Sequence, residues 1–285
     1  MPAANLTGRS YYTVTGTTSK LLKKGFTFGT SYGDGGHASG SVYVDKVAVG
    51  SATATSQAVE AATSVSSGYI SNRDIDGMLG MGFTDANSVR PTQQNTFFDS
   101  VKTSLVKPLF AVTFKHSAAG SLDFGYINST KYTGKLSYAP VDASSGYWKF
   151  PLRRYGINGT NYNYGVNFDA IVDTGTTLMY LPDNIVKLYY SKVPGAAIDT
   201  SIGAWTFPCT STPPPLGLFV NGTKYTVPGK FINWQSGLAN NHCWGGLQSS
   251  ANLPFAILGS VFLKAVYAVF DESTGSARIG IAKQA

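Results

Sequence analysis

Short apolar or alternating segments, separated by clusters of Gly, Asn, Asp and Ser, follow one another along most of the chain. This arrangement is typical of many short β-strands divided by turns. The segments in question are 25–32, 39–49, 109–114, 135–141, 170–181 and 266–270. The pattern of hydrophobic and polar positions therefore predicts a mostly β protein.

Two other segments, 96–106 and 184–192, have apolar residues at helical spacing. Lys107-Pro108 ends the first segment, and Pro182-Asp183 opens the second. Their apolar stripes consist of Phe97, Val101 and Leu105 in the first segment, and of Ile185, Leu188 and Tyr189 in the second. We expect each to form a short helix.

The sequence contains a weak internal duplication. The pattern Leu-Gly-x-x-Phe occurs at 79–83 and again at 258–262. An apolar approach precedes each copy, and the second copy begins 179 residues after the first. The duplication predicts two related lobes, which we place at residues 1–139 and 140–285. We expect the second lobe to be the more stable one.

Composition narrows the possible partners. Charged residues make up 13% of the chain, well below the usual quarter, and the formal net charge is +7. Lys and Arg are scattered, whereas nucleic-acid binding usually needs a concentrated basic face or a recognisable module. The sequence contains no run of 18 apolar residues, the length at which a membrane span is expected, and no signal peptide is visible after Met1. We therefore expect neither a nucleic-acid partner nor a membrane partner.

The cysteines and the glycosylation acceptors point outside the cell. The only two cysteines, Cys209 and Cys243, predict one disulfide, with two unrelated buried thiols as the open alternative. Neither a CxxC motif nor a Cys/His cluster offers a metal site. Four Asn-x-Ser/Thr acceptors are candidate glycosylation sites: Asn5, Asn128, Asn158 and Asn221.

The candidate chemistry lies at residues 172–177, which are Val-Asp-Thr-Gly-Thr-Thr and occur once. A carboxylate on a tight glycine turn between two apolar strands is how a β protein presents an acid. Acid–base chemistry with such a group normally needs a second one opposite it, so that one takes a proton and the other gives one. Two carboxyls about 3 Å apart can share a proton and divide these roles. Asp173 is therefore a candidate catalytic acid that needs a second carboxyl.

Several segments together resemble the fungal pepsin-like aspartic endopeptidases of the penicillopepsin and aspergillopepsin kind. The resemblance runs from about residue 8 to the C-terminus. The matching segments are Ser31-Tyr32-Gly33-Asp34-Gly35 with Ala38-Ser39-Gly40, Asp76-Gly77-Met78-Leu79-Gly80, Thr96-Phe97-Phe98-Asp99-Ser100-Val101-Lys102, the motif at 172–177, the pair Cys209 and Cys243, and Leu258-Gly259 with Val269-Phe270-Asp271.

The resemblance implies a bilobal pepsin-like acid protease fold, with the cleft between the lobes. It implies that Asp173 is catalytic, that the Thr176 hydroxyl supports its loop, and that Gly175 and Thr177 help to bind substrate. Tyr32, Gly33, Asp34 and Gly35 would form the tip of a hairpin, the flap, that closes over an extended peptide. It further implies a secreted monomer that acts on proteins or peptides, binds pepstatin-like inhibitors and uses no cofactor.

The chain also departs from the family pattern. Gly36 replaces the more usual Ser in the flap, and Ser260 stands where relatives often have Asp. The first Asp-Thr-Gly loop is absent, and the repeat offset places the partner of Asp173 at position −6, before Met1. The N-terminal lobe is therefore expected to be incomplete.

Two functional hypotheses follow from these observations. The first is an acid endopeptidase, and the second is a catalytically impaired relative that binds peptides or inhibitors without cutting them. A third idea, two chains that each lend Asp173, has no support in the sequence.

Overall fold

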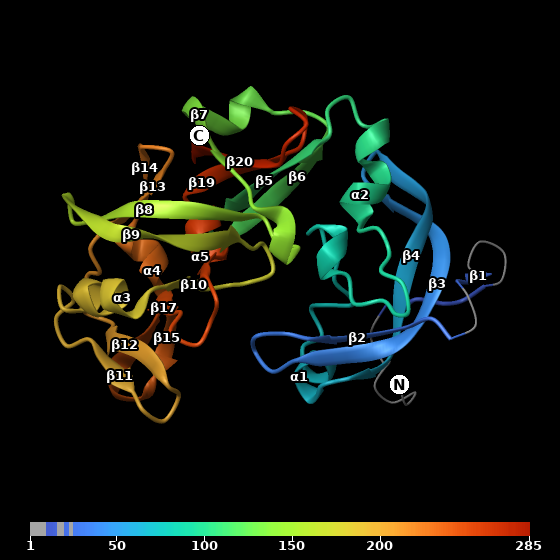
Figure 1. Cartoon of the computed structure of the whole chain (residues 1–285). Helices are drawn as coiled ribbons and strands as arrows, with labels where there is room; N and C mark the ends of the chain where they lie inside the picture. Colours follow the sequence, from blue (N-terminus) through green and yellow to red (C-terminus); the bar gives the residue numbers. More distant parts are fainter. Residues whose placement is uncertain (1–9, 16–19, 23–24) are drawn as a thin grey trace. The chain divides into compact units, whose positions relative to one another are not determined.

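The computed structural model describes residues 10–15, 20–22 and 25–285 (Figure 1). The chain divides into two compact units. Unit 1 consists of Met1–Lys107 and Ser144–Tyr147, and unit 2 consists of Pro108–Ala143 and Trp148–Ala285. No helix in the described ranges has both the length and the apolar character that a membrane span requires.

Unit 1 is built on a four-stranded antiparallel sheet in which β3 pairs with each of the other three strands. The strands are β1 (Lys20–Leu21), β2 (Thr27–Ser31), β3 (His37–Val49) and β4 (Ala52–Val65). Phe26, Phe28, Val42 and Val89 form a small buried cluster against this sheet. Two short helices, α1 (Ser67–Ser71) and α2 (Phe97–Val101), follow the strands.

Helix α2 confirms the expected helix at its start but is shorter than predicted. The Thr96 side chain caps it by accepting a hydrogen bond from the Asp99 amide, as a threonine before a helix commonly does. Phe97, Phe98 and Val101 are buried. After Val101 the chain tightens into a 3₁₀ turn, Lys102–Ser104. The expected continuation to residue 106 is wrong, because the turn before Pro108 leaves the α-helical conformation.

Unit 2 contains three sheets. Their strand orders are β14-β13-β8-β9-β18-β10-β17, β11-β12-β16-β15 and β6-β5-β19-β20-β7. The strands of the first sheet are β14 (Thr223–Val227), β13 (Leu216–Val220), β8 (Lys149–Ile157), β9 (Thr160–Val172), β18 (Ala256–Leu258), β10 (Met179–Leu181) and β17 (Leu247–Ser249). Those of the second are β11 (Ala197–Asp199), β12 (Ala204–Pro208), β16 (His242–Gly245) and β15 (Asn233–Leu238). Those of the third are β6 (Ala118–Phe124), β5 (Leu109–Lys115), β19 (Val266–Asp271), β20 (Arg278–Gln284) and β7 (Tyr132–Pro140).

The third sheet explains why the compact units divide the chain after Lys107 rather than near residue 139. Strand β5 pairs with β19, and β7 pairs with β20, so residues from both sides of the expected boundary share one sheet. Leu109, Ala111, Tyr267 and Val269 form one buried cluster in it. The predicted lobe boundary at 139/140 stays a prediction. It does not coincide with the boundary between the two compact units, which lies after Lys107.

Three α-helices complete unit 2: α3 (Asp183–Tyr190), α4 (Gly229–Ile232) and α5 (Ser260–Leu263). The predicted helix at 184–192 is confirmed as α3, but its buried face is rotated from the expected one. Ile185, Val186, Tyr189 and Tyr190 are buried, whereas Leu188 is only half-buried.

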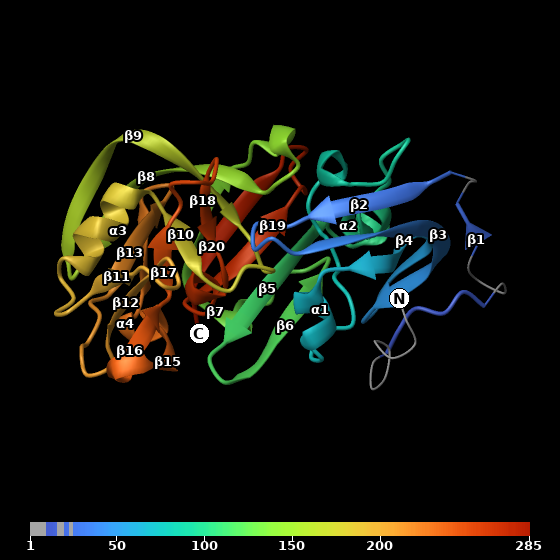
Figure 2. The same cartoon turned by 90° about the horizontal axis from the view of Figure 1, so that it is seen from below.

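The feature of unit 2 that positions the acidic motif is the place of β18 in the seven-stranded sheet (Figure 2). This strand lies between β9 and β10, parallel to β9 and antiparallel to β10. Its two neighbours are joined by residues 173–178, which include the Asp-Thr-Gly motif. A strand from much later in the sequence therefore separates the two strands that carry the motif.

Candidate active site

Asp173 is the first residue after β9, on the loop that leads to β10. The flanking residues Ile171, Val172, Leu178 and Met179 are buried, so the loop is anchored at both ends. Asp173 and Thr176 are half-buried, and Thr174, Gly175 and Thr177 are exposed. The apolar strands thus hold an acid at the surface end of a packed sheet.

The Asp173 carboxylate is held by its own loop. One oxygen, Oδ1, accepts a hydrogen bond of 2.8 Å from the Gly175 amide. The other, Oδ2, accepts one of 2.5 Å from the Thr176 hydroxyl. A β-carbon at Gly175 would lie only 3.3 Å from Oδ1, so glycine leaves the space that this bond needs.

The segment after β18 fixes this loop from the side. The Asp173 amide donates to the Leu258 carbonyl at 3.2 Å, and the Ser260 amide donates to the Thr176 carbonyl at 2.8 Å. The Ser260 hydroxyl donates to the Thr177 carbonyl at 2.9 Å. Ser260, noted above as a departure from the family pattern, therefore supports the loop of residues 173–178, which we call the acid loop.

The segment after β18 lies so close to the acid loop that position 259 has room only for glycine. A β-carbon there would lie 2.2 Å from the Leu178 carbonyl oxygen and 2.4 Å from that of Thr176. The sequence marked Leu258-Gly259 as part of a repeat without indicating that it touches the acid loop. No local signal in the sequence marks this contact, because Gly259 lies more than eighty residues after the loop that it touches.

No second carboxyl bonds the Asp173 side chain among the residues that the structure describes. Its carboxylate bonds, in the part of the chain that the structure describes, come from Gly175 and Thr176. Such a group can accept a proton from water, but the second role in a paired acid–base scheme needs another carboxyl.

The predicted flap residues form the turn of the β2–β3 hairpin in unit 1. Strand β2 pairs with β3 in antiparallel register up to Ser31 and His37. The turn is closed by the Tyr32 amide, which donates to the Gly36 carbonyl at 2.8 Å, and by the Gly35 amide, which donates to the Tyr32 carbonyl at 3.0 Å. Gly35 has a φ of +83°, a conformation that favours glycine. Tyr32, Gly33, Asp34 and Gly35 are therefore brought together at one exposed tip.

The predicted disulfide is confirmed. Cys209 and Cys243 are joined with an S–S distance of 2.02 Å, which links the end of β12 to β16 in the second sheet of unit 2.

Of the four glycosylation candidates, Asn5 lies outside the described residues. Asn158 and Asn221 are exposed, each with a positive φ and followed by a positive-φ glycine in the turn of a hairpin. Asn128 is half-buried, and its side chain accepts hydrogen bonds from the amide and the hydroxyl of Thr130.

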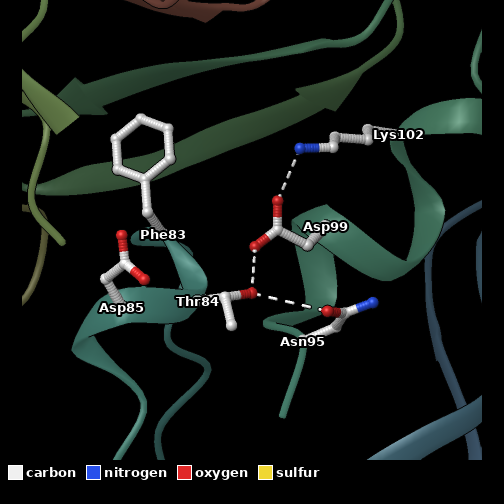
Figure 3. Close-up of a pocket in the computed structure, with 6 residues that line it drawn as sticks. All are labelled: Phe83, Thr84, Asp85, Asn95, Asp99 and Lys102. Atoms are coloured by element: carbon white, nitrogen blue, oxygen red, sulfur yellow. Dashed lines mark hydrogen bonds and ion pairs between the residues drawn. The ribbon is translucent and has the colours of Figure 1, made fainter. Parts of the chain in front are cut away.

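A separate open pocket of about 440 Å³ lies in unit 1 (Figure 3). Its lining residues are Phe83, Thr84, Asp85, Asn95, Asp99 and Lys102. Both oxygens of Asp99 are occupied, one by the Lys102 ammonium at 2.6 Å and the other by the Thr84 hydroxyl at 2.8 Å and the Thr96 hydroxyl at 3.2 Å. This carboxylate therefore ties the start of α2 to residue 84, which is a structural role.

The fold and the acid loop together define a mostly β protein that presents an aspartate on a strand-to-strand loop of the sequence Asp-Thr-Gly. The family model for eukaryotic aspartyl proteases matches residues 3–284. The chain therefore belongs to the eukaryotic aspartyl protease family.

Individual relatives agree with this assignment. The chain is 48% identical over 276 residues to penicillopepsin-1 of Talaromyces stipitatus, covering 97% of this chain and 70% of the relative. It is 46% identical over 285 residues to aspartic protease pepA of Leptosphaeria maculans, covering 99% and 68%. It is 43% identical to penicillopepsin-1 of Penicillium janthinellum over 285 residues, covering 100% and 86%. The expected resemblance to fungal pepsin-like endopeptidases is confirmed.

A solved structure supports the fold class as well. The crystal structure of the aspartic proteinase from Irpex lacteus superposes with a TM-score of 0.78 at 25% sequence identity, covering 97% of this chain and 85% of that one. The prediction of a mostly β, pepsin-like fold is thereby confirmed.

Proposed function

We propose that the chain hydrolyses peptide bonds as an aspartic endopeptidase in which Asp173 is one of the two catalytic carboxyls. The observation that carries this proposal is the loop itself. Both oxygens of Asp173 accept hydrogen bonds from donors two and three residues further along, and residues 258–261 hold that loop in place. A carboxylate fixed in this way is positioned to take a proton from a water molecule.

In this proposal a water oxygen attacks the carbonyl carbon of the scissile peptide bond while a carboxylate accepts the water proton. The second carboxyl gives its proton to the carbonyl oxygen, which forms a gem-diol. The first carboxyl then gives the proton that it took from water to the leaving nitrogen, while the second takes a proton back from the gem-diol, so that the two acids exchange roles during one turnover. Hydrolysis therefore depends on a second carboxyl that shares a proton with Asp173.

The proposed substrate is a protein or peptide bound in an extended conformation. Gly175, Thr176 and Thr177 would bind its backbone near the cut bond, and the hairpin tip of Tyr32, Gly33, Asp34 and Gly35 would contact the peptide as a flap. Pepstatin-like inhibitors would occupy the same positions. The support for these roles is the family membership and the exposure of both segments.

We further propose that the protein works outside the cell as a monomer that can be glycosylated. The Cys209–Cys243 disulfide supports an oxidising compartment. The exposed Asn158 and Asn221 support the glycosylation part of the proposal.

A second candidate function is peptide or inhibitor binding without hydrolysis. The observation that favours it is the single occurrence of the Val-Asp-Thr-Gly motif in these 285 residues. Losing one general acid or base typically lowers a rate by about 10²- to 10⁴-fold. A chain with one carboxyl would then retain the binding groups and lose turnover.

One experiment separates the two functions. Hydrolysis of casein and binding of pepstatin are measured at acid pH for the natural chain, for Asp173→Asn and for the control Asp199→Asn. Asp199 is a suitable control because its carboxylate also accepts bonds from its own turn, from the amide and hydroxyl of Ser201. Hydrolysis that is lost only in Asp173→Asn supports the endopeptidase. Pepstatin binding without hydrolysis supports the impaired relative, and the absence of both activities in a folded sample overturns both proposals.

A further inference from the structure

Gly36, at the end of the hairpin turn, stands where the family usually has Ser, and the structure supplies a steric reason. A β-carbon built at Gly36 would lie 2.7 Å from the Tyr69 hydroxyl oxygen, 2.9 Å from the Tyr69 Cζ and 2.8 Å from Asp34 Oδ1. Real β-carbons essentially never approach a heavy atom this closely. The neighbouring Gly33 and Gly35 would meet nothing within 4 Å. Position 36 is therefore kept small by its neighbours, chiefly Tyr69.

Tyr69 comes from α1, which is fastened to the base of the hairpin tip. The Ser66 amide, just before α1, donates to the His37 carbonyl at 2.9 Å, and the His37 amide donates back to the Ser66 hydroxyl at 3.3 Å. Strand β4 leaves the ladder at Val65, opposite Ala38. Because α1 starts directly after this point, it carries Tyr69 to the side of the turn.

The ring of Tyr69 meets the ring of Tyr32 edge to face, with the centroids 5.9 Å apart and the planes at 88°. This is a preferred geometry for an aromatic pair. Burial raises the pKa of the Tyr32 hydroxyl, and Tyr69, Glu60 and Asp34 add to the effect. Tyr32 is nevertheless 37% exposed, so its ring is supported on one side and open on another.

We propose that Tyr69 is a positioning residue for Tyr32, and that glycine at position 36 is what admits it. The ring of Tyr69 fixes the ring of Tyr32, while its hydroxyl fills the space that a side chain at position 36 would need. The effect on a bound peptide rests on the proposed function, in which Tyr32 contacts substrate. The contact between the two tyrosines and Gly36 lies wholly within unit 1 and does not depend on that function.

The contact can be tested with 3-fluorotyrosine placed at position 32 and observed by ¹⁹F NMR in the folded chain without ligand. Tyr69→Leu should move the fluorine resonance toward its position in an unfolded peptide, because the neighbouring ring is lost. Tyr69→Phe keeps the ring and should leave the resonance near its natural position. Gly36→Ala should displace Tyr69 and move the resonance as well.

The decisive arm is the double variant. When Tyr69→Leu is already present, Gly36→Ala should move the resonance much less than it does in the natural chain, since the Tyr69 hydroxyl and Cζ are gone; such non-additivity is expected of residues in contact. Gly29→Ala is the matched control, because a β-carbon there meets nothing within 4 Å in the same hairpin. Tyr11→Leu is the control for loss of an exposed tyrosine in unit 1. Neither control should move the resonance.

An unchanged resonance in Tyr69→Leu, or additive shifts in the double variant, would overturn the proposal. A role in stability alone would lower the urea midpoint and leave the fluorine position of the folded state unchanged. In a second arm, Tyr69→Leu should weaken pepstatin binding by roughly twofold to tenfold, the range expected for one aromatic pair. A fluorine result as expected, together with no pepstatin binding by the natural chain, would count against the proposed function and leave the positioning role intact.

Discussion

The two Leu-Gly-x-x-Phe segments have the same pattern and opposite environments. In unit 2, Ala256 and Leu258 are buried in β18, with β9 on one side and β10 on the other. In unit 1, Met78 and Leu79 are 58% and 43% exposed, and the structure assigns residues 76–80 to no strand. The comparison teaches that the apolar approach to this pattern, which ends at its Leu, becomes a core strand only where neighbouring strands supply hydrogen bonds and apolar cover. It also shows that the acid loop is built in unit 2 by that strand.

The largest expected difference in stability is between variants in which the leucine of one segment or the other is replaced by alanine. Leu258→Ala removes a fully buried side chain and should lower the free energy of unfolding by about 2–5 kcal/mol. Leu79→Ala removes an exposed side chain and should change it by no more than about 0.5 kcal/mol. Urea titrations of both variants measure this. Equal losses would show that the two environments do not differ as described.

Substitution of the glycine should also destabilise the protein more in the segment of unit 2, at Gly259, than in that of unit 1, at Gly80. Gly259→Ala drives a β-carbon against the Leu178 and Thr176 carbonyls and should cost about 1–3 kcal/mol, the usual range for overpacking. Gly80→Ala meets nothing within 4 Å and is the matched control. Thermal unfolding followed by circular dichroism compares them. If Gly80→Ala proves the more harmful, the carbonyl contacts of Gly259 are not the cause.

A smaller expected effect is a difference between the two units in how one carboxyl of each makes stability depend on pH. In unit 1, burial raises the pKa of Glu60, against a hydrogen bond from Asn87 that lowers it. The folded state therefore holds the Glu60 proton to higher pH than the unfolded chain does, and this contribution to stability is lost as the pH rises through the folded-state pKa. Glu60→Gln should raise the urea midpoint at pH 7 and change it little at pH 3. A gain of equal size at both pH values would rule out this explanation.

In unit 2 the pKa of Asp183 shifts in the opposite direction from that of Glu60, so its contribution to stability depends on pH in the opposite way. The hydrogen bond from Lys187, helped by one from Ser249, holds the pKa of Asp183 below its ordinary value. The contribution of Asp183 is present at neutral pH and is lost as the pH falls through its folded-state pKa. Asp183→Asn should therefore lower the urea midpoint at pH 7 and have little effect near pH 2. The effect is expected to be the smallest of these, since the pair is well exposed to solvent.

The sequence predicts much of this fold because local signals and tertiary structure agree in many elements. The apolar segments at 109–114 and 266–270 form β5 and β19, and the Asp-Thr-Gly turn lies between two strands as expected. Strand β4 is not among the segments that the apolar pattern indicates. Its Ala, Thr and Ser residues are small, and its pairing along β3 supplies the order instead.

What could not be predicted depends on contacts between distant residues. Ser260 bonds the acid loop 83 residues earlier, and Tyr69 meets a turn that lies more than thirty residues before it. Residues 79–83 and 258–262 match in pattern, so the pattern alone could not show that only one copy is buried. Burial is decided by the strands on either side, which are remote in sequence.

Hydrogen exchange tests the central claim most directly, because it reports the two segments in one experiment. We predict that the amides of residues 256–258 exchange only when unit 2 unfolds, whereas those of residues 76–80 exchange close to the rates of an unstructured peptide. Equal protection of both segments would contradict the account, since the acid loop of Asp173 would then no longer be distinguished by the strand that supports it.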